Sequence, residues 1–208
     1  GKRRSFAKNE LILIEEIFMK ITFKYITYLL FLGLIISSLY LANLYSNKPY
    51  SIDHYLGKEL IVGVLDSPEY MTYLGIFDDY NWALGHNRKL SIPTSEDAES
   101  DYQDNLKTLA TLKNYDVKDL NYNQRVTQKI AIFDTENDIK EFEKFRYHSY
   151  PFNQISGNHL GLVEFMTDTH PVRSEREAAD YIDRVKLFDD SLSANLIWLE
   201  EQKKLGIF

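Results

Sequence analysis

Residues Tyr25 to Tyr45 read YITYLLFLGLIISSLYLANLY, a run of 21 residues without a charged side chain. About twenty mainly apolar residues in a helix span the hydrocarbon core of a bilayer, because each residue advances about 1.5 Å and the helix satisfies its own backbone polar groups. We therefore predict that the chain contacts a lipid bilayer through residues 25–45.

The run fits an uncleaved anchor better than a cleaved secretory signal. A signal peptide has an apolar region of about 7–15 residues and small residues before its cleavage site. This run is longer, and Tyr40 stands two positions before Ala42. Secretion after signal cleavage remains one alternative, and a buried helix of a soluble core is another.

Basic residues indicate the orientation of this helix. Lys20 and Lys24 lie on its N-terminal side, and the positive-inside bias places that side in the cytoplasm. We expect a single N-terminal span in the cell membrane, with the main domain extracytoplasmic, either periplasmic or extracellular.

The position of the first methionine divides the N-terminal part further. Residue 1 is Gly and the first Met is Met19, which begins a sequence like an ordinary export leader. We interpret residues 1–18 as a cytoplasmic or non-native extension, residues 19–48 as the signal or anchor helix, and residues 49–208 as one α-helical region.

Charge and cysteine content exclude several classes of function. Residues 1–24 carry six basic and three acidic side chains, a net charge of +3, so the remainder carries −10 of the overall −7. An acidic exported part makes nucleic acid an unsuitable partner. The absence of Cys excludes a disulfide framework and thiol lipidation.

The exported part has the periodicity of long helices, and we predict an all-α fold: an N-terminal transmembrane or signal helix followed by a bundle of long antiparallel helices. Apolar residues at three-to-four spacing indicate helices over about 51–65, from Thr94 or Ser95 to about 115, and over 121–147. The capping box Ser174-Glu-Arg-Glu177 predicts a last helix of about thirty residues that ends at Gly206. Residues 75–94 are rich in turn formers.

Polar and aromatic residues concentrate in the least regular segment, residues 147–171. Binding residues often lie on such a loop when helices hold it rigidly, so we predict that Asn153, Gln154 and His159 form hydrogen bonds to a ligand. The alternative is structural: these side chains cap the neighbouring helices and hydrogen-bond the loop to itself.

No catalytic or metal-binding motif is present, and we assign no catalytic residue and no metal ligand. The five histidines are not followed by Glu and no two stand at i, i+4, so the zinc helix of many peptidases is absent. Gln154 stands where a nucleophile elbow before Ser156 needs Gly.

Several segments in fixed order resemble the N-terminal part of the bacterial domain of unknown function 885 family. They are Asp66-Ser-Pro-Glu-Tyr-Met-Thr-Tyr-Leu-Gly75, Tyr150-Pro-Phe-Asn-Gln-Ile-Ser-Gly157, His170-Pro171, Ala179-Asp-Tyr-Ile-Asp-Arg184 and Leu205-Gly-Ile207. The resemblance covers about residues 51–208.

This resemblance implies a larger protein. Members of the family are several hundred residues long, largely α-helical, often exported and similar to zinc metallopeptidases, with a His-Glu-x-x-x-x-His motif in a C-terminal half that this chain lacks. Zinc is thus expected in that half, and no zinc ligand or general base of the family maps onto a residue here.

Two hypotheses follow. In the first, the chain is the non-catalytic N-terminal fragment of an exported, membrane-anchored zinc-dependent peptidase or hydrolase. It forms one wall of the substrate cleft for a peptide or small amide and is inactive alone. In the second, it is a stand-alone membrane-anchored helical interaction module without enzymatic activity.

Overall fold

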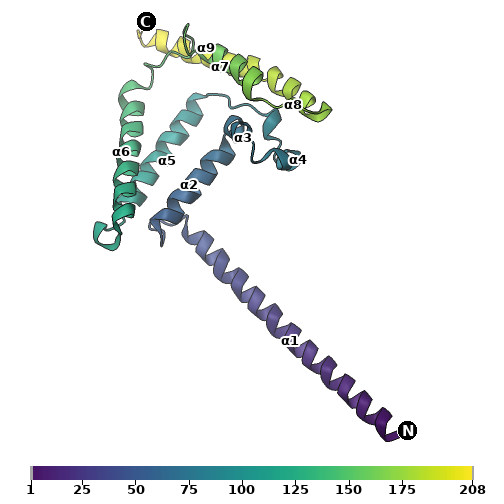
Figure 1. Cartoon of the computed structure of the whole chain (residues 1–208). Coiled ribbons are helices and arrows are strands. Elements are labelled where there is room, and N and C mark those ends of the chain that lie inside the picture. Colours follow the sequence, from purple (N-terminus) through teal and green to yellow (C-terminus); the bar gives the residue numbers. More distant parts are fainter. Residues whose placement is uncertain (1, 208) are drawn as a thin grey trace. The chain divides into compact units, whose positions relative to one another are not determined.

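The computed structural model describes residues 2–207, and the side chains of residues 18–207 (Figure 1). Within residues 2–207 the regular elements are all helical, which confirms the all-α prediction. The chain divides into two compact units, Gly1–Tyr50 and Ser51–Phe208. We describe each unit separately.

The first unit consists of helix α1 (Lys2–Asn43) and a short turn. Residues Phe18–Asn43 form the candidate membrane span, 26 residues with a mean hydropathy of 1.9 and none of the window buried. Because a helix rises about 1.5 Å per residue, this span exceeds the roughly 30 Å of a hydrocarbon core. The helix therefore fits a membrane span or a signal sequence, and its exposure does not fit a buried core helix.

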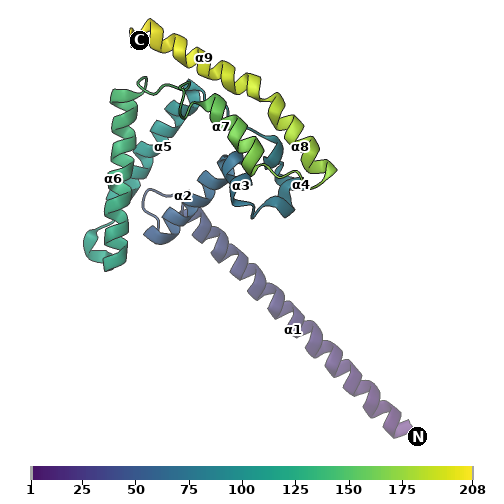
Figure 2. The same ribbon diagram turned by 45° about the horizontal axis from the view of Figure 1, so that its top comes forward.

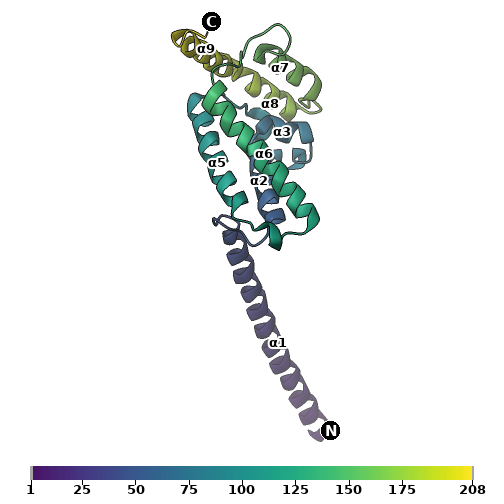
Figure 3. The same ribbon diagram turned by 90° about the vertical axis from the view of Figure 1, so that its left-hand side faces the viewer.

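Three long helices form the first half of the second unit: α2 (Ile52–Asp66), α5 (Ser95–Lys113) and α6 (Tyr122–Phe145). Their starts follow from capping residues, since the side chains of Ser51, Thr94 and Asn121 accept hydrogen bonds from the first turns of the three helices. Helices α5 and α6 lie antiparallel and side by side, with α2 beside them (Figures 1 and 3).

A small apolar core joins these three helices. Its buried members are Ile52, Tyr55, Leu112, Tyr115 and Leu120. The end of α5 is fixed by a buried amide, because Gln128 Nε2 on α6 donates to the carbonyl oxygens of Leu112 and Tyr115 at 2.8 and 3.0 Å. This contact fixes the register between α5 and α6.

Short helices connect α2 to α5 where the sequence predicts turns. Helix α3 (Pro68–Leu74) begins at Pro68 and ends at Gly75, which has φ +65. The segment then forms η1 (Asp78–Tyr80), α4 (Asn81–Leu84) and η2 (His86–Arg88) before an extended stretch to Thr94. Another single turn, η3 (Val117–Asp119), joins α5 to α6.

The second half contains α7 (Asn158–Glu164), the π-helical turn η4 (Phe165–Thr169), α8 (Glu175–Lys186) and α9 (Phe188–Lys204). The prediction of one last helix of about thirty residues is wrong, because Leu187 separates α8 from α9 (Figure 2). There the backbone tightens: Leu187 N–H donates to Arg184 O at 3.0 Å, an i to i−3 bond, and its ψ is −3°.

A buried arginine joins α8 to the segment that precedes α5. Arg184 is 0 % exposed. It donates to Lys89 O at 2.6 Å, to Thr72 Oγ1 at 3.0 Å, to His170 Nδ1 at 2.9 Å and to His86 O. The guanidinium thereby holds four separate segments together.

Candidate functional site

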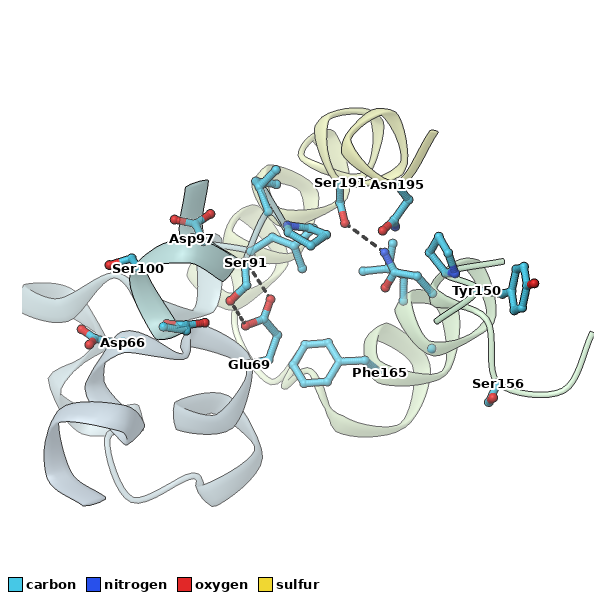
Figure 4. A pocket seen from close by; sticks show the side chains of 18 residues that line it. Asp66, Glu69, Ser91, Asp97, Ser100, Tyr150, Ser156, Phe165, Ser191 and Asn195 are labelled. Carbon is cyan, nitrogen blue, oxygen red and sulfur yellow. Dashed lines mark hydrogen bonds between the residues drawn. The ribbon is translucent and has the colours of Figure 1, made fainter. Parts of the chain in front are cut away.

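A pocket of the second unit lies between the start of α5 and the helices α7 and α9. Its volume is about 1070 Å³. Residues of α2, α3, α5, α7, η4 and α9 line it, together with the extended stretch before α5 and the loop before α7. Figure 4 shows that these groups line two opposing sides.

One side of the pocket is acidic. Asp66 at the end of α2, Glu69 on α3, and Asp97 and Asp101 on α5 all line it, and no lysine, arginine or histidine does. Among the described side chains, none of these four carboxylates forms an ion pair. The lining therefore carries concentrated negative charge and no cation of its own, although the buried Arg184 interacts electrostatically with Glu69.

Proximity of these charges affects the titration of Asp101. Partial burial, and then the negative charges of Asp97, Asp104 and Asp66, raise the pKa of the Asp101 carboxyl. The negative charges of Asp66 and Asp97 on the same side of the pocket thus disfavour the ionised form of Asp101.

Glu69 also fixes the neighbouring wall. Its carboxylate oxygens accept from Ser91 N at 2.6 Å and from Ser91 Oγ at 2.7 Å. Because Arg184 binds the carbonyl of Lys89 two residues earlier, the extended stretch is held at both points. Leu90, Ile92 and Pro93 of that stretch give the acidic side an apolar edge.

The opposite side combines aromatic, aliphatic and amide groups. Phe165 and Tyr150 appear on this side in Figure 4, with Asn195 and Ser191 of α9. The Phe165 ring also contacts the buried guanidinium of Arg184, at 5.1 Å from its centroid. This contact fixes the ring where η4 begins.

Two amides on this side differ in their hydrogen bonds. Asn158 Nδ2 donates to Ser191 Oγ at 3.2 Å. Asn195 is 5 % exposed, and its buried Nδ2 has no hydrogen-bond partner in the described part of the chain. A buried amide donor without a partner is unusual in a folded protein.

The residues predicted for binding lie beside the pocket and do not line it. Asn153 Oδ1 accepts from Ile155 N at 2.9 Å and Ser156 N at 2.7 Å, so this side chain closes its own loop, as the structural alternative expects. Gln154 is exposed, and the His159 ring lies 5.7 Å from that of Phe152. A ligand role for Asn153, Gln154 and His159 remains a prediction.

The predicted loop nevertheless contributes to the site through other residues. Tyr150, Pro151, Ser156 and Asn158 line the pocket. Gly157 allows the loop to turn tightly, because a Cβ there would lie 2.6 Å from Asn153 N. The loop thus borders the pocket, whereas the four carboxylates are scattered on three helices and carried no local motif.

The described residues offer no cluster of side chains that could bind a metal ion. No group of three His, Asp or Glu side chains between residues 18 and 207 could hold a metal ion. The family resemblance implies zinc in a C-terminal half, and no cluster of side chains among the described residues fits that ion.

Together, these features define an all-α protein with an apolar N-terminal helix and a helical unit that carries an acid-walled pocket. Residues 68–208 match the family described as bacterial protein of unknown function (DUF885). Since the match covers more than half of the chain, the chain belongs to this family. The match begins at Pro68, so α2 lies outside it. No curated protein and no solved structure matches the chain significantly.

Proposed function

We propose that the second unit is the substrate-binding, non-catalytic part of an exported, membrane-anchored peptidase or related hydrolase. The pocket would form one wall of a cleft for a peptide or small amide. The observation that carries the proposal is the pocket itself, which combines charged, apolar and amide groups; apart from Asp66, all of its lining residues lie within the region that the family match covers. Its volume of about 1070 Å³ is sufficient for a few residues of a peptide, since small-molecule sites measure about 300–1,000 Å³.

A pocket-filling substitution tests this function. Gly161 lines the pocket, and a Cβ there would meet no atom within 4 Å. Gly161→Leu should therefore reduce the space for a ligand, and its Cβ would meet no neighbouring atom. Gly63→Leu is the matched control, because Gly63 is also exposed in a helix with no atom within 4 Å of its Cβ and does not line this pocket.

The full chain in detergent micelles would be dialysed against a library of random pentapeptides, and retained peptides counted by mass spectrometry. We expect retention by the natural chain and by Gly63→Leu, and a loss of about tenfold or more with Gly161→Leu. The proposal would be overturned if the folded natural chain retained no peptide, or if the two variants retained equal amounts.

In this proposal, hydrolysis is carried out by the C-terminal half that the family resemblance implies, and not by residues of this chain. The chain alone should therefore cleave no peptide or small amide, with or without added zinc. Incubation of the chain with a quenched fluorescent peptide mixture checks this, and cleavage that a chelator abolishes would contradict it.

The second candidate is the stand-alone, membrane-anchored interaction module. The apolar side chains that α6 exposes to solvent favour it, among them Ile130 and Phe133, which are 56 % and 64 % exposed. This alternative predicts no peptide retention, together with self-association in sedimentation that Ile130→Ser and Phe133→Ser abolish.

A further inference from the structure

The composition of the pocket specifies the charge of its ligand. Four carboxylates line it and no cationic side chain does. A bound cation would relieve their mutual repulsion, whereas an anion would meet a field of its own sign. A cationic ligand is therefore favoured over a neutral or anionic one of the same size.

The position of Asp66 adds to this argument. It is the last residue of α2, whose last turn holds no basic residue. A carboxylate at a helix C-terminus faces the negative end of the helix dipole, so this position does not favour the helix. Asp66 thus gains nothing from the dipole of its own helix and lies in the lining of the pocket, where it can meet a cation.

Asn195 supplies an independent observation on the opposite side. Its buried Nδ2 lacks an acceptor, and Figure 4 shows Asn195 facing the pocket across from Glu69 and Asp97. A ligand carbonyl or carboxylate oxygen would complete this hydrogen bond. A metal cation has no acceptor to offer, and a simple amine has none either.

Apolar groups complete the description. Leu90, Ile92, Leu162 and Phe165 line the same pocket. They suit a hydrocarbon side chain or stem between the charged end of the ligand and its carbonyl. Protonated amine, apolar stem and carbonyl together are the chemistry of a peptide residue.

We propose that this pocket binds a protonated amine of a peptide against Asp66, Glu69, Asp97 and Asp101, while Asn195 donates to a carbonyl oxygen of the same ligand. The inference rests on the proposed function, since it names the substrate class of that site. The amine comes either from the peptide's amino terminus or from a lysine side chain, and the test separates these sources.

The probes are three tripeptide amides, Leu-Ala-Ala with a free amino terminus, its N-acetylated form, and N-acetylated Lys-Ala-Ala. Their affinities for the full chain in detergent would be measured by isothermal titration calorimetry. We expect at least one cationic probe to bind about tenfold or more tightly than the N-acetylated Leu-Ala-Ala amide. Preference for the free amino terminus or for the acetylated lysine probe identifies the source.

Matched variants test the two sides of the pocket. Asp66→Asn with Asp101→Asn should remove the preference for amines. The control, Glu96→Gln with Asp119→Asn, makes the same charge change at exposed positions outside the pocket and should keep the preference. Asn195→Leu should weaken all amine-bearing probes about tenfold, with the fold checked by circular dichroism.

The outcomes distinguish the amine site from the peptide-binding function on which it rests. If the chain retains the pentapeptide library but binds the N-acetylated Leu-Ala-Ala amide as tightly as both amine-bearing probes, the assignment of an amine site is wrong. The proposed peptide binding then stands. If Asn195→Leu binds as the natural chain does, the assignment of the carbonyl donor is wrong. If no peptide binds at all, both proposals fail.

Discussion

Arg184 holds together the segments that shape the pocket. Its guanidinium binds the carbonyl before the wall residue Leu90 and contacts the Phe165 ring. Burial lowers the pKa of Arg184 to about 10, so the side chain is still charged at neutral pH. Main-chain carbonyls, the Thr72 hydroxyl and His170 Nδ1 accept its hydrogen bonds, and the negative charges of Glu69 and Asp180 oppose the lowering of its pKa.

Arg184→Leu should destabilise the second unit by about 3 kcal/mol or more, because several buried acceptors lose their donor. Arg176→Leu, at an exposed position of the same helix, should change stability by about 0.5 kcal/mol or less. Urea unfolding followed by circular dichroism measures both. Equal midpoints for the two variants would show that the buried contacts contribute little.

His170 adds a pH dependence to the same cluster. Its Nδ1 accepts a hydrogen bond from Arg184, and desolvation, then the charge of Arg184, lower the pKa of His170 although Glu177 and Asp180 oppose the shift. Since an unfolded histidine titrates near pH 6.5, the unfolded chain binds more protons below that pH, and stability falls as the pH drops. Buried His86, whose pKa is also lowered by desolvation, acts in the same direction.

His170→Asn should keep an acceptor for Arg184 and remove the titration. We expect the loss of unfolding temperature between about pH 7 and pH 5 to be smaller in this variant than in the natural chain. His148→Asn, at an exposed histidine, should retain the natural slope. An unchanged slope in His170→Asn would indicate that another group dominates.

At the scale of elements, the sequence predicts which residues cap the helices, but it does not predict which helix faces are buried by neighbouring elements. The predicted starts at Thr94, Asn121 and Ser174 are confirmed, because each side chain accepts a bond from its own first turn. The Glu177 carboxylate departs from the capping box, since it binds Arg173 instead. The break at Leu187 has no Pro or Gly to signal it.

The predicted apolar faces are only partly buried. Leu112 and Ile139 are buried, whereas Tyr122 on α6 is 72 % exposed and Ile182 on α8 is 56 % exposed. Periodicity shows which side of a helix is apolar, but not what packs against it.

Gly75 ends α3 and begins the series of short turns that leads to the pocket wall. Its N–H donates to Met71 O at 3.2 Å, and its φ is +65. Gly75→Ala should cost about 1 kcal/mol, because a Cβ is unfavourable at positive φ. Gly63→Ala, inside α2 with open space around its Cβ, should instead stabilise by about 0.5–1 kcal/mol. Opposite shifts in unfolding temperature confirm the pair, and shifts of the same sign contradict it.

At the scale of the whole molecule, the pocket can serve an extracytoplasmic substrate only if α1 places the second unit outside. The 26-residue apolar part of α1 fits a span or a signal, and Lys20 with Lys24 favours a cytoplasmic N-terminal side.

Thiol labelling tests this orientation. Because the chain contains no Cys, a single introduced cysteine is the only site that can react. We expect a membrane-impermeant maleimide to label Lys118→Cys, an exposed position of η3, in spheroplasts that express the chain. Ser5→Cys should react only after lysis, because the cytoplasm would enclose it. The reverse pattern would invert the topology and exclude the proposed substrate compartment. An intact mass for the labelled protein supports the anchor, whereas loss of the residues before about position 43 would establish secretion after cleavage.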